Sequence, residues 1–230
     1  MEKTPHYHLN IKGDILFENN SSQNSISFEK LTPILPNQKK RIALIDRDGV
    51  IVEKAQKLKY LQRAEDMKLI PGAPEAIQYL NKKGILVVLV TNQPGIYKRQ
   101  FTREDLYGMT AVIQKGLGQG KIDAVFFCPH AAPTEGDNIS QEEECLCRKP
   151  KPGMLTTAMK LYGIDKENAI MFGDFASDIG AARNAEVTAA FIATKHDEFE
   201  AMQQKIQQEY PEVFEKRQYL HLLEAVKDLF

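Results

Sequence analysis

From residue 42 onward, short apolar runs alternate with longer segments of helical periodicity. The apolar runs predict five strands, at residues 42–46, 85–92, 121–129, 168–174 and 188–194. Apolar residues at helical spacing predict five helices, at residues 71–84, 102–118, 151–163, 177–185 and 221–230. Strands that alternate with helices are typical of a parallel sheet with helices on both faces. We therefore expect an α/β fold with a doubly wound parallel sheet.

The residues at the ends of these segments support the division. Residues 85–90 are continuously apolar, as a strand buried on both faces requires. Gly84 ends the helical pattern before that strand, and Thr102 precedes an acidic first helical turn. The charged stretch 198–218 has sparse apolar positions, and we expect a solvated helix or loop there.

The first 40 residues do not follow this pattern. Residues 6–11 and 26–31 have β character, and the polar run NNSSQNS lies between them. Two prolines and the run QKKR then indicate a linker. We expect residues 1–40 to be an N-terminal extension, either flexible or folded as a small hairpin, and residues 41–230 to form the main domain.

Composition excludes several classes of protein. The chain has 230 residues, of which 43% are apolar and 27% charged, and its formal net charge is −1. These are values of an ordinary globular domain, and they give no reason to expect a nucleic-acid partner. The longest apolar run is too short to span a bilayer, and the N-terminus lacks the apolar core of a signal peptide. We expect a cytoplasmic monomer with no membrane partner.

Polar side chains follow the predicted strands at the points where they end. Because ligands of doubly wound sheets bind beyond the carboxyl ends of the strands, these side chains are expected to lie together. They include carboxylates, a hydroxyl, an amide and two cations that open a later helix, namely Asp46, Asp48, Thr91, Asn92, Arg148, Lys149 and Asp174.

The chemistry of this set suits phosphoryl transfer. Crowded carboxylates repel one another unless a hard cation such as Mg²⁺ neutralises them, and Mg²⁺ binds carboxylates, water and phosphate. The hydroxyl of Thr91, the amide of Asn92 and the ammonium of Lys149 can bind phosphate. An aspartate can attack phosphorus, and a neighbouring aspartate can transfer the protons. Any one of these aspartates alone would more simply be a turn or cap residue.

Four motifs in order resemble the haloacid dehalogenase superfamily of phosphatases over about residues 42–230. They are D46-R-D48-G-V, V-T91-N92-Q93, K149 and G173-D174-F-A-S-D178. The resemblance implies that Asp46 is the nucleophile and a Mg²⁺ ligand. It implies that Asp48 is the general acid and base, with its carbonyl on the metal. It assigns the remaining roles to Thr91 and Lys149 (phosphate), Asn92 and Gln93 (substrate), Asp174 (metal), and Asp178 and Gly49 (support).

Three cysteines and a histidine form a second set. Cys128, His130, Cys145 and Cys147 occur as two closely spaced pairs joined by residues 131–144. Three thiolates and an imidazole suit a closed, tetrahedral Zn²⁺ site, which would anchor that loop. The alternative to a metal site is that these residues are three thiols and an unrelated histidine. A disulfide between Cys145 and Cys147 would be strained.

The cysteine pattern, followed by R-K-P-K-P-G-M, resembles one branch of the superfamily. That branch contains heptose 1,7-bisphosphate 7-phosphatases and histidinol-phosphate phosphatase domains, in which a zinc loop replaces a cap domain. The resemblance implies a phosphoric monoester hydrolase of lipopolysaccharide precursor synthesis, with Arg148 binding a substrate anion. Its cofactors would be Mg²⁺ and Zn²⁺, and its substrate a phosphorylated sugar.

Two positions depart from the pattern expected of the heptose enzymes. Phe175 stands where a substrate-contacting lysine is expected, and Lys59 replaces a glycine before Tyr60. Both departures bear on the substrate and leave the chemistry unchanged. The alternatives are a histidinol-phosphate phosphatase or a non-catalytic binding module on the same fold. Intact Asp46 and Asp48 argue against the binding module.

Overall fold

The computed structural model describes residues 7–9, 15–17, 41–54, 61–131, 145–194 and 199–230. Four features of the sequence prediction lie mostly or wholly outside these residues. They are the second β-like stretch, the linker, the Lys59-Tyr60 pair, and all but the first residue of the segment that joins the two cysteine pairs. In the described part of the chain, no helix combines the length and apolar character needed to cross a membrane.

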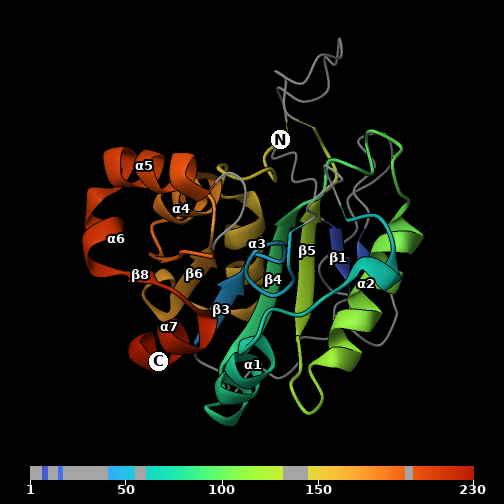
Figure 1. The fold of residues 1–230 in the computed structure, drawn as a ribbon, viewed down its shortest axis with the longest axis horizontal. Coiled ribbons are helices and arrows are strands. Elements are labelled where there is room, and N and C mark those ends of the chain that lie inside the picture. Colours follow the sequence, from blue (N-terminus) through green and yellow to red (C-terminus); the bar gives the residue numbers. More distant parts are fainter. Residues whose placement is uncertain (1–6, 10–14, 18–40, 55–60, 132–144, 195–198) are drawn as a thin grey trace.

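The strands form one sheet in the order β2-β1-β5-β4-β3-β6-β7-β8 (Figure 1). Neighbouring strands from β5 to β8 pair in parallel. These parallel strands are β3 (Ile42–Ile45), β4 (Leu86–Asn92), β5 (Ala124–Cys128), β6 (Ala169–Gly173), β7 (Thr188–Ile192) and β8 (Gln218–Tyr219). The β1 strand (Tyr7–Leu9) pairs antiparallel with both β5 and β2 (Ile15–Phe17). The division into an extension and a main domain stays a prediction.

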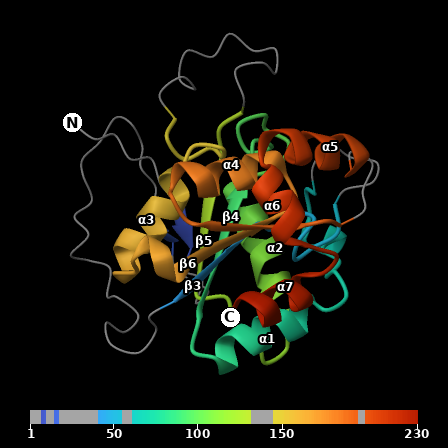
Figure 2. The ribbon, with the colours of Figure 1, turned by 90° about the vertical axis from the view of Figure 1, so that its left-hand side faces the viewer.

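Helices cover both faces of the sheet, and Figure 2 shows α3 and α2 on opposite sides of the strands. Buried side chains of one face pack with α1 (Ala73–Lys82), α2 (Arg103–Gly116) and α7 (Leu222–Leu229). Those of the other face pack with α3 (Gly153–Tyr162), α4 (Ala176–Asn184), α5 (Phe199–Glu209) and α6 (Pro211–Lys216). Short 3-10 helices span Ala64–Asp66 and Lys166–Asn168. The predicted doubly wound α/β architecture is confirmed.

The alternation of side chains along β3 explains the two apolar layers. Ala43 and Ile45 belong to one core, whereas Ile42 and Leu44 belong to the other. Successive side chains of a strand point to opposite faces, so an apolar run without polar interruption must be covered on both sides. The order of the sheet then brings the carboxyl ends of β4, β3 and β6 next to one another.

The charged stretch near the C-terminus is more ordered than the sequence suggests. Residues expected to be solvated form α5, α6 and β8, and Met202, Ile206 and Val213 are buried against α4 and the sheet. The expected helix is present, since α5 and α6 are helices with mostly exposed residues, but the buried apolar stripe and β8 were not predicted. A narrow apolar stripe suffices here because the opposite sides of these helices face water.

Candidate active site

Asp46 directly follows β3, and its backbone N–H donates to the carbonyl of Phe172 in β6 over 2.9 Å. The chain then turns sharply at Gly49, whose φ is +89°. A Cβ at this position would lie 2.1 Å from Asp174 Oδ2. Glycine therefore lets the backbone approach a carboxylate that any side chain would displace.

Lys149 connects two of the predicted aspartates. Its Nζ lies 2.9 Å from Asp46 Oδ1 and 2.6 Å from Asp178 Oδ1, and it donates to the carbonyl of Val90 over 2.7 Å. The side chain is buried. Burial alone would lower the pKa of Lys149, but the charges of Asp178 and Asp46 outweigh it and raise that pKa well above its usual range. Lys149 is therefore a fixed positive charge.

Carboxylates of two strand ends and one helix meet beside this lysine. Oxygen atoms of Asp46, Asp174 and Asp178 lie within 4.8 Å of one another. Burial raises the pKa of Asp174 to about 8, although the nearby charge of Lys54 lowers it, since Lys54 Nζ lies 2.6 Å from Asp174 Oδ2. Burial also raises the pKa of Asp46 to about 6.

This cluster fits Mg²⁺. Its donors are carboxylate oxygens, which are the ligands that a hard cation prefers. Two ammonium groups, Lys149 and Lys54, face three carboxylates in the cluster, and a bound phosphate would add further negative charge. Burial is the main cause of the raised pKa values of Asp46 and Asp174, because it disfavours the ionised carboxylates, whereas a divalent cation would favour them.

Asp48 points to a different set of partners. Arg47 Nε and Nη2 donate to its two oxygens over 3.0 Å and 2.9 Å, and Gln93 Nε2 donates to Oδ2 over 2.8 Å. The same Gln93 Nε2 donates to Oγ1 of the buried Thr91 over 2.9 Å. The predicted acid and base is thus linked to the predicted phosphate-binding hydroxyl.

Asn92 and Arg148 contact the backbone around the lysine. The Asn92 side chain accepts from the Lys149 N–H over 3.0 Å and donates to the Lys149 carbonyl over 3.1 Å. Arg148 Nη1 donates to the carbonyl of His130 over 2.8 Å. In the structure Asn92 therefore positions the backbone of Lys149, and Arg148 connects that backbone to His130. Their contacts with substrate stay predictions.

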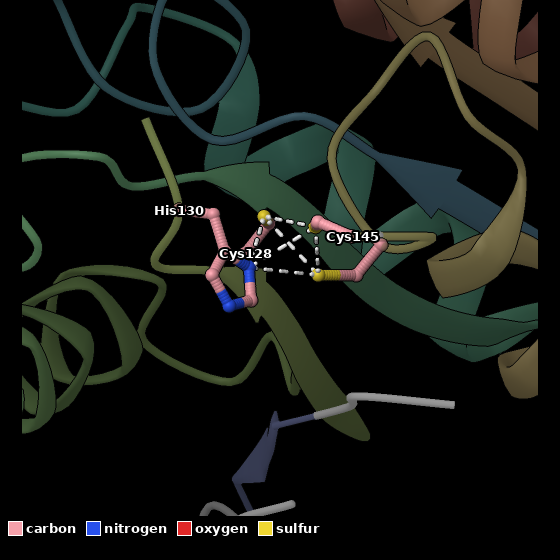
Figure 3. A group of neighbouring side chains, drawn as sticks. Cys128, His130 and Cys145 are labelled. Carbon is pink, nitrogen blue, oxygen red and sulfur yellow. Dashed lines mark hydrogen bonds between the residues drawn. The ribbon is translucent and has the colours of Figure 1, made fainter. Parts of the chain in front are cut away.

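The four predicted zinc ligands converge at the end of β5, and Figure 3 shows Cys128, His130 and Cys145 facing a common centre. The three sulfur atoms are 3.0 to 3.6 Å apart. His130 Nδ1 lies 3.1 to 3.4 Å from each of them. Tetrahedral Zn–S bonds of about 2.3 Å would separate sulfurs by about 3.8 Å, so a small outward shift would admit the ion.

The ionisation of the thiols also suits a metal. Hydrogen bonds from Cys128 and Cys147 hold the pKa of Cys145 far below its usual range. Burial raises the pKa of Cys128, and hydrogen bonds to Cys128 and Cys145 raise that of Cys147. Thiols packed this closely do not ionise independently, and Zn²⁺ would favour all three thiolates.

Two charged residues of the site were missed by the sequence prediction. Arg47 lies between the two motif aspartates, at the end of a buried strand. A charged side chain in such a place needs a partner of opposite charge, and this signal could have identified it. Lys54 had no such signal. Its Nζ lies 3.9 Å from the centroid of the Phe175 ring, so a cation is present beside the position where a lysine was expected.

A nucleophile candidate, a buried lysine and clustered carboxylates at the carboxyl edge of a parallel sheet define a hydrolase of the phosphoryl-transfer class. Comparison with known proteins agrees with this class. The family model of haloacid dehalogenase-like hydrolases matches residues 15–186. The chain belongs to the haloacid dehalogenase-like hydrolase family, which confirms the resemblance seen in the motifs. The match begins ahead of residue 42, where the motif-based resemblance starts.

The relatives within the family are similar in sequence and structure. The chain is 39% identical over 152 residues to the D-glycero-beta-D-manno-heptose-1,7-bisphosphate 7-phosphatase of Vibrio cholerae, covering 64% of this chain and 78% of that protein. It is 31% identical over 162 residues to the D-glycero-alpha-D-manno-heptose-1,7-bisphosphate 7-phosphatase of Photorhabdus laumondii, covering 69% of this chain and 85% of that protein.

A solved structure is also similar over most of the chain. The D,D-heptose 1,7-bisphosphate phosphatase from B. bronchiseptica, complexed with magnesium and phosphate, matches with a TM-score of 0.69 at 28% identity. The match covers 82% of this chain and 97% of that one.

Proposed function

We propose that this chain is a Mg²⁺-dependent sugar-phosphate phosphatase that removes the 7-phosphate of D-glycero-D-manno-heptose 1,7-bisphosphate. The observation that carries the proposal is the contact of Asp46 with Lys149 inside the buried carboxylate cluster. The names of the relatives support the substrate, and they include enzymes for both anomers.

The first step forms a covalent intermediate. A carboxylate oxygen of Asp46 attacks phosphorus, and the bond from phosphorus to the sugar oxygen breaks. Asp48 gives its proton to that leaving oxygen. Lys149 and Thr91 hold the phosphoryl oxygens, where a fixed positive charge stabilises the transition state.

The second step releases phosphate. Asp48, now ionised, takes a proton from water, and the water oxygen attacks phosphorus. The bond from phosphorus to Asp46 breaks, which restores the nucleophile. Arg148, Asn92 and Gln93 border this centre and are proposed to contact substrate. Asp178 orders it, because its Oδ2 accepts from the Phe175 N–H over 3.0 Å while its Oδ1 pairs with Lys149.

Each metal has a separate role in the proposal. Asp46, Asp174 and the carbonyl of Asp48 would hold Mg²⁺, which neutralises charge on the phosphoryl group. Cys128, His130, Cys145 and Cys147 would hold a structural Zn²⁺. That ion would hold Cys128, His130 and the turn from Cys145 to Cys147 beside Arg148, and we propose that substrate enters near them.

The test is phosphate release with Mg²⁺ from both anomers of heptose 1,7-bisphosphate, histidinol phosphate, fructose 1,6-bisphosphate and p-nitrophenyl phosphate. We expect a preference for a heptose bisphosphate. We expect Asp46→Asn to abolish release, and the matched variant of an exposed aspartate, Asp165→Asn, to retain it. Preference for another substrate would overturn the substrate assignment. Silence across the panel would favour a non-catalytic module.

A further inference from the structure

Arg47 is the largest fully buried side chain near the site, and the reaction proposed above gives it no role. Its side chain is 2% exposed, whereas that of its partner Asp48 is 28% exposed. Arg47 Nη1 lies 4.0 Å from Met109 Sδ in α2. Packing against α2 therefore fixes the guanidinium, while the carboxylate stands at the border with solvent.

The contacts of Asp48 distinguish its two oxygens. Within the described residues, Oδ2 accepts from Arg47 Nη2 and Gln93 Nε2, and Oδ1 accepts from Arg47 Nε. An ionised carboxylate has about four lone-pair directions, two on each oxygen. These contacts fill both directions of Oδ2 and one of Oδ1. The remaining direction of Oδ1 is the one open to a further proton donor or acceptor.

We propose that Arg47 is a positioning residue, which, together with Gln93, fixes the Asp48 carboxylate so that Oδ1 exchanges the proton of the reaction. The guanidinium donates two parallel hydrogen bonds to the carboxylate and so fixes its plane. The ammonium of a lysine, which acts as a point charge, could not fix it. Gln93 couples that plane to Thr91, so the proton-transferring oxygen and the phosphate-binding hydroxyl keep one geometry. This inference rests on the proposed phosphatase function.

The alternative is that the Arg47–Asp48 ion pair is only structural, with Asp48 neutralising the charge of a buried arginine. The two readings differ in how they depend on the leaving group. A sugar alkoxide needs a proton to leave, and general acid catalysis contributes about 10²- to 10⁴-fold to such a step. The p-nitrophenolate anion leaves without one. A defect in orienting Asp48 should therefore affect sugar phosphates selectively.

The experiment measures kcat/KM, which reports the step that expels the leaving group, for the preferred sugar phosphate and for p-nitrophenyl phosphate. For Arg47→Lys, which keeps the charge and loses the fork, we expect a fall of about tenfold or more on the sugar phosphate and less than about threefold on the nitrophenyl ester. Arg41→Lys is the matched control, because Arg41 donates to the carbonyl of Leu229 at the opposite end of β3. It should leave the ratio unchanged.

A double-mutant cycle completes the test. Asp48→Asn should show the same selective loss, and adding Arg47→Lys to it should cause no further selective loss. Equal losses on both substrates, or fully additive losses, would overturn the positioning role. If Arg47→Lys does not fold, Gln93→Met tests the same network with Arg47 retained, and an unchanged ratio would overturn it.

Failure of the inference and failure of the proposed function give different results. Phosphate release by the wild type, with a selective loss in Asp48→Asn and none in Arg47→Lys, would retain the function and reject the role of Arg47. A wild type that releases no phosphate from any substrate would reject the function itself.

Discussion

At the scale of single residues, Gly49 shows how tightly the backbone packs against the metal site. An alanine there would adopt a φ near +89° and place its Cβ 2.1 Å from Asp174 Oδ2. We expect Gly49→Ala to lower the unfolding free energy by about 1–3 kcal/mol, from backbone strain. We expect it also to weaken Mg²⁺ binding by about tenfold or more, because the carboxylate must move. Urea unfolding and calorimetric Mg²⁺ titration measure the two effects.

Gly163 supplies the matched control. It ends α3 with a φ of +62°, and a Cβ there meets nothing within 4 Å. Gly163→Ala should therefore cost about 1 kcal/mol of stability and leave the Mg²⁺ affinity unchanged. If both variants lost stability equally and neither lost Mg²⁺ affinity, the close approach of Gly49 to Asp174 would be wrong.

The sequence predicts which side chains gather at the site better than it predicts the individual contacts of each side chain. Asp46, Thr91 and Asp174 each follow an apolar run, so the topology of a parallel sheet brings them to one edge. The contacts of Lys54 and Arg47 depend on the course of the turn after Gly49. That turn is set by its own backbone hydrogen bonds, such as Gly49 N–H to the Val52 carbonyl over 2.7 Å. Local periodicity carries no signal for it.

At the scale of elements, the long apolar runs are predictable and the short ones are not. The predicted helix at 102–118 is observed at Arg103–Gly116, where Thr102 Oγ1 accepts from the Asp105 N–H over 3.1 Å. The two-residue β8 has no recognisable pattern, because its pairing with β7 is decided by tertiary packing. Short edge elements of this kind depend on the sheet that they join.

The turn that contains Cys145 and Cys147 leads to a prediction at the scale of elements. Gly153 N–H at the start of α3 donates to the Leu146 carbonyl over 3.1 Å, so the turn between the last two cysteines packs on a helix. We expect Cys147→Ser to lose bound zinc and to lower Tm by several degrees, because the remaining ligands cannot close the site. Metal analysis of the purified protein and thermal unfolding measure both.

The residue between those cysteines provides the control. Leu146 is 44% exposed, so Leu146→Ser changes the same turn without removing a ligand. It should retain one zinc per chain and an almost unchanged Tm. Full zinc occupancy in Cys147→Ser would contradict the four-ligand assignment.

At the scale of the whole molecule, the site joins distant parts of the chain. Asp46 follows β3, Lys149 precedes α3 and Asp178 lies in α4, so their contacts exist only when the sheet and the helical layer of α3 and α4 are assembled. A cation bound by this cluster therefore binds the folded protein and not the unfolded chain, and it stabilises the fold by mass action. The site and the stability of the molecule are coupled.

This coupling depends on pH, because burial raises the pKa of Asp174 from 3.8 to about 8 and that of Asp46 to about 6. The unfolded chain ionises these two carboxyl groups at about pH 4, whereas the folded protein keeps them protonated up to their raised pKa values. The unfolding free energy without Mg²⁺ therefore falls as pH rises from about 4 to about 8. Mg²⁺ favours the ionised carboxylates and should restore it. The gain in Tm on adding saturating Mg²⁺ should therefore be larger at about pH 8 than at about pH 6.

Thermal unfolding of zinc-loaded protein, with and without Mg²⁺, measures that gain across the pH range. Asp174→Asn removes one of the two titrating groups and a metal ligand together, so its unfolding should depend less on pH and respond little to Mg²⁺. A gain in Tm that did not change with pH in the wild type would mean that protons and Mg²⁺ do not compete for these oxygens. The cation would then bind elsewhere, because ligands buried at raised pKa must release protons before they can hold it.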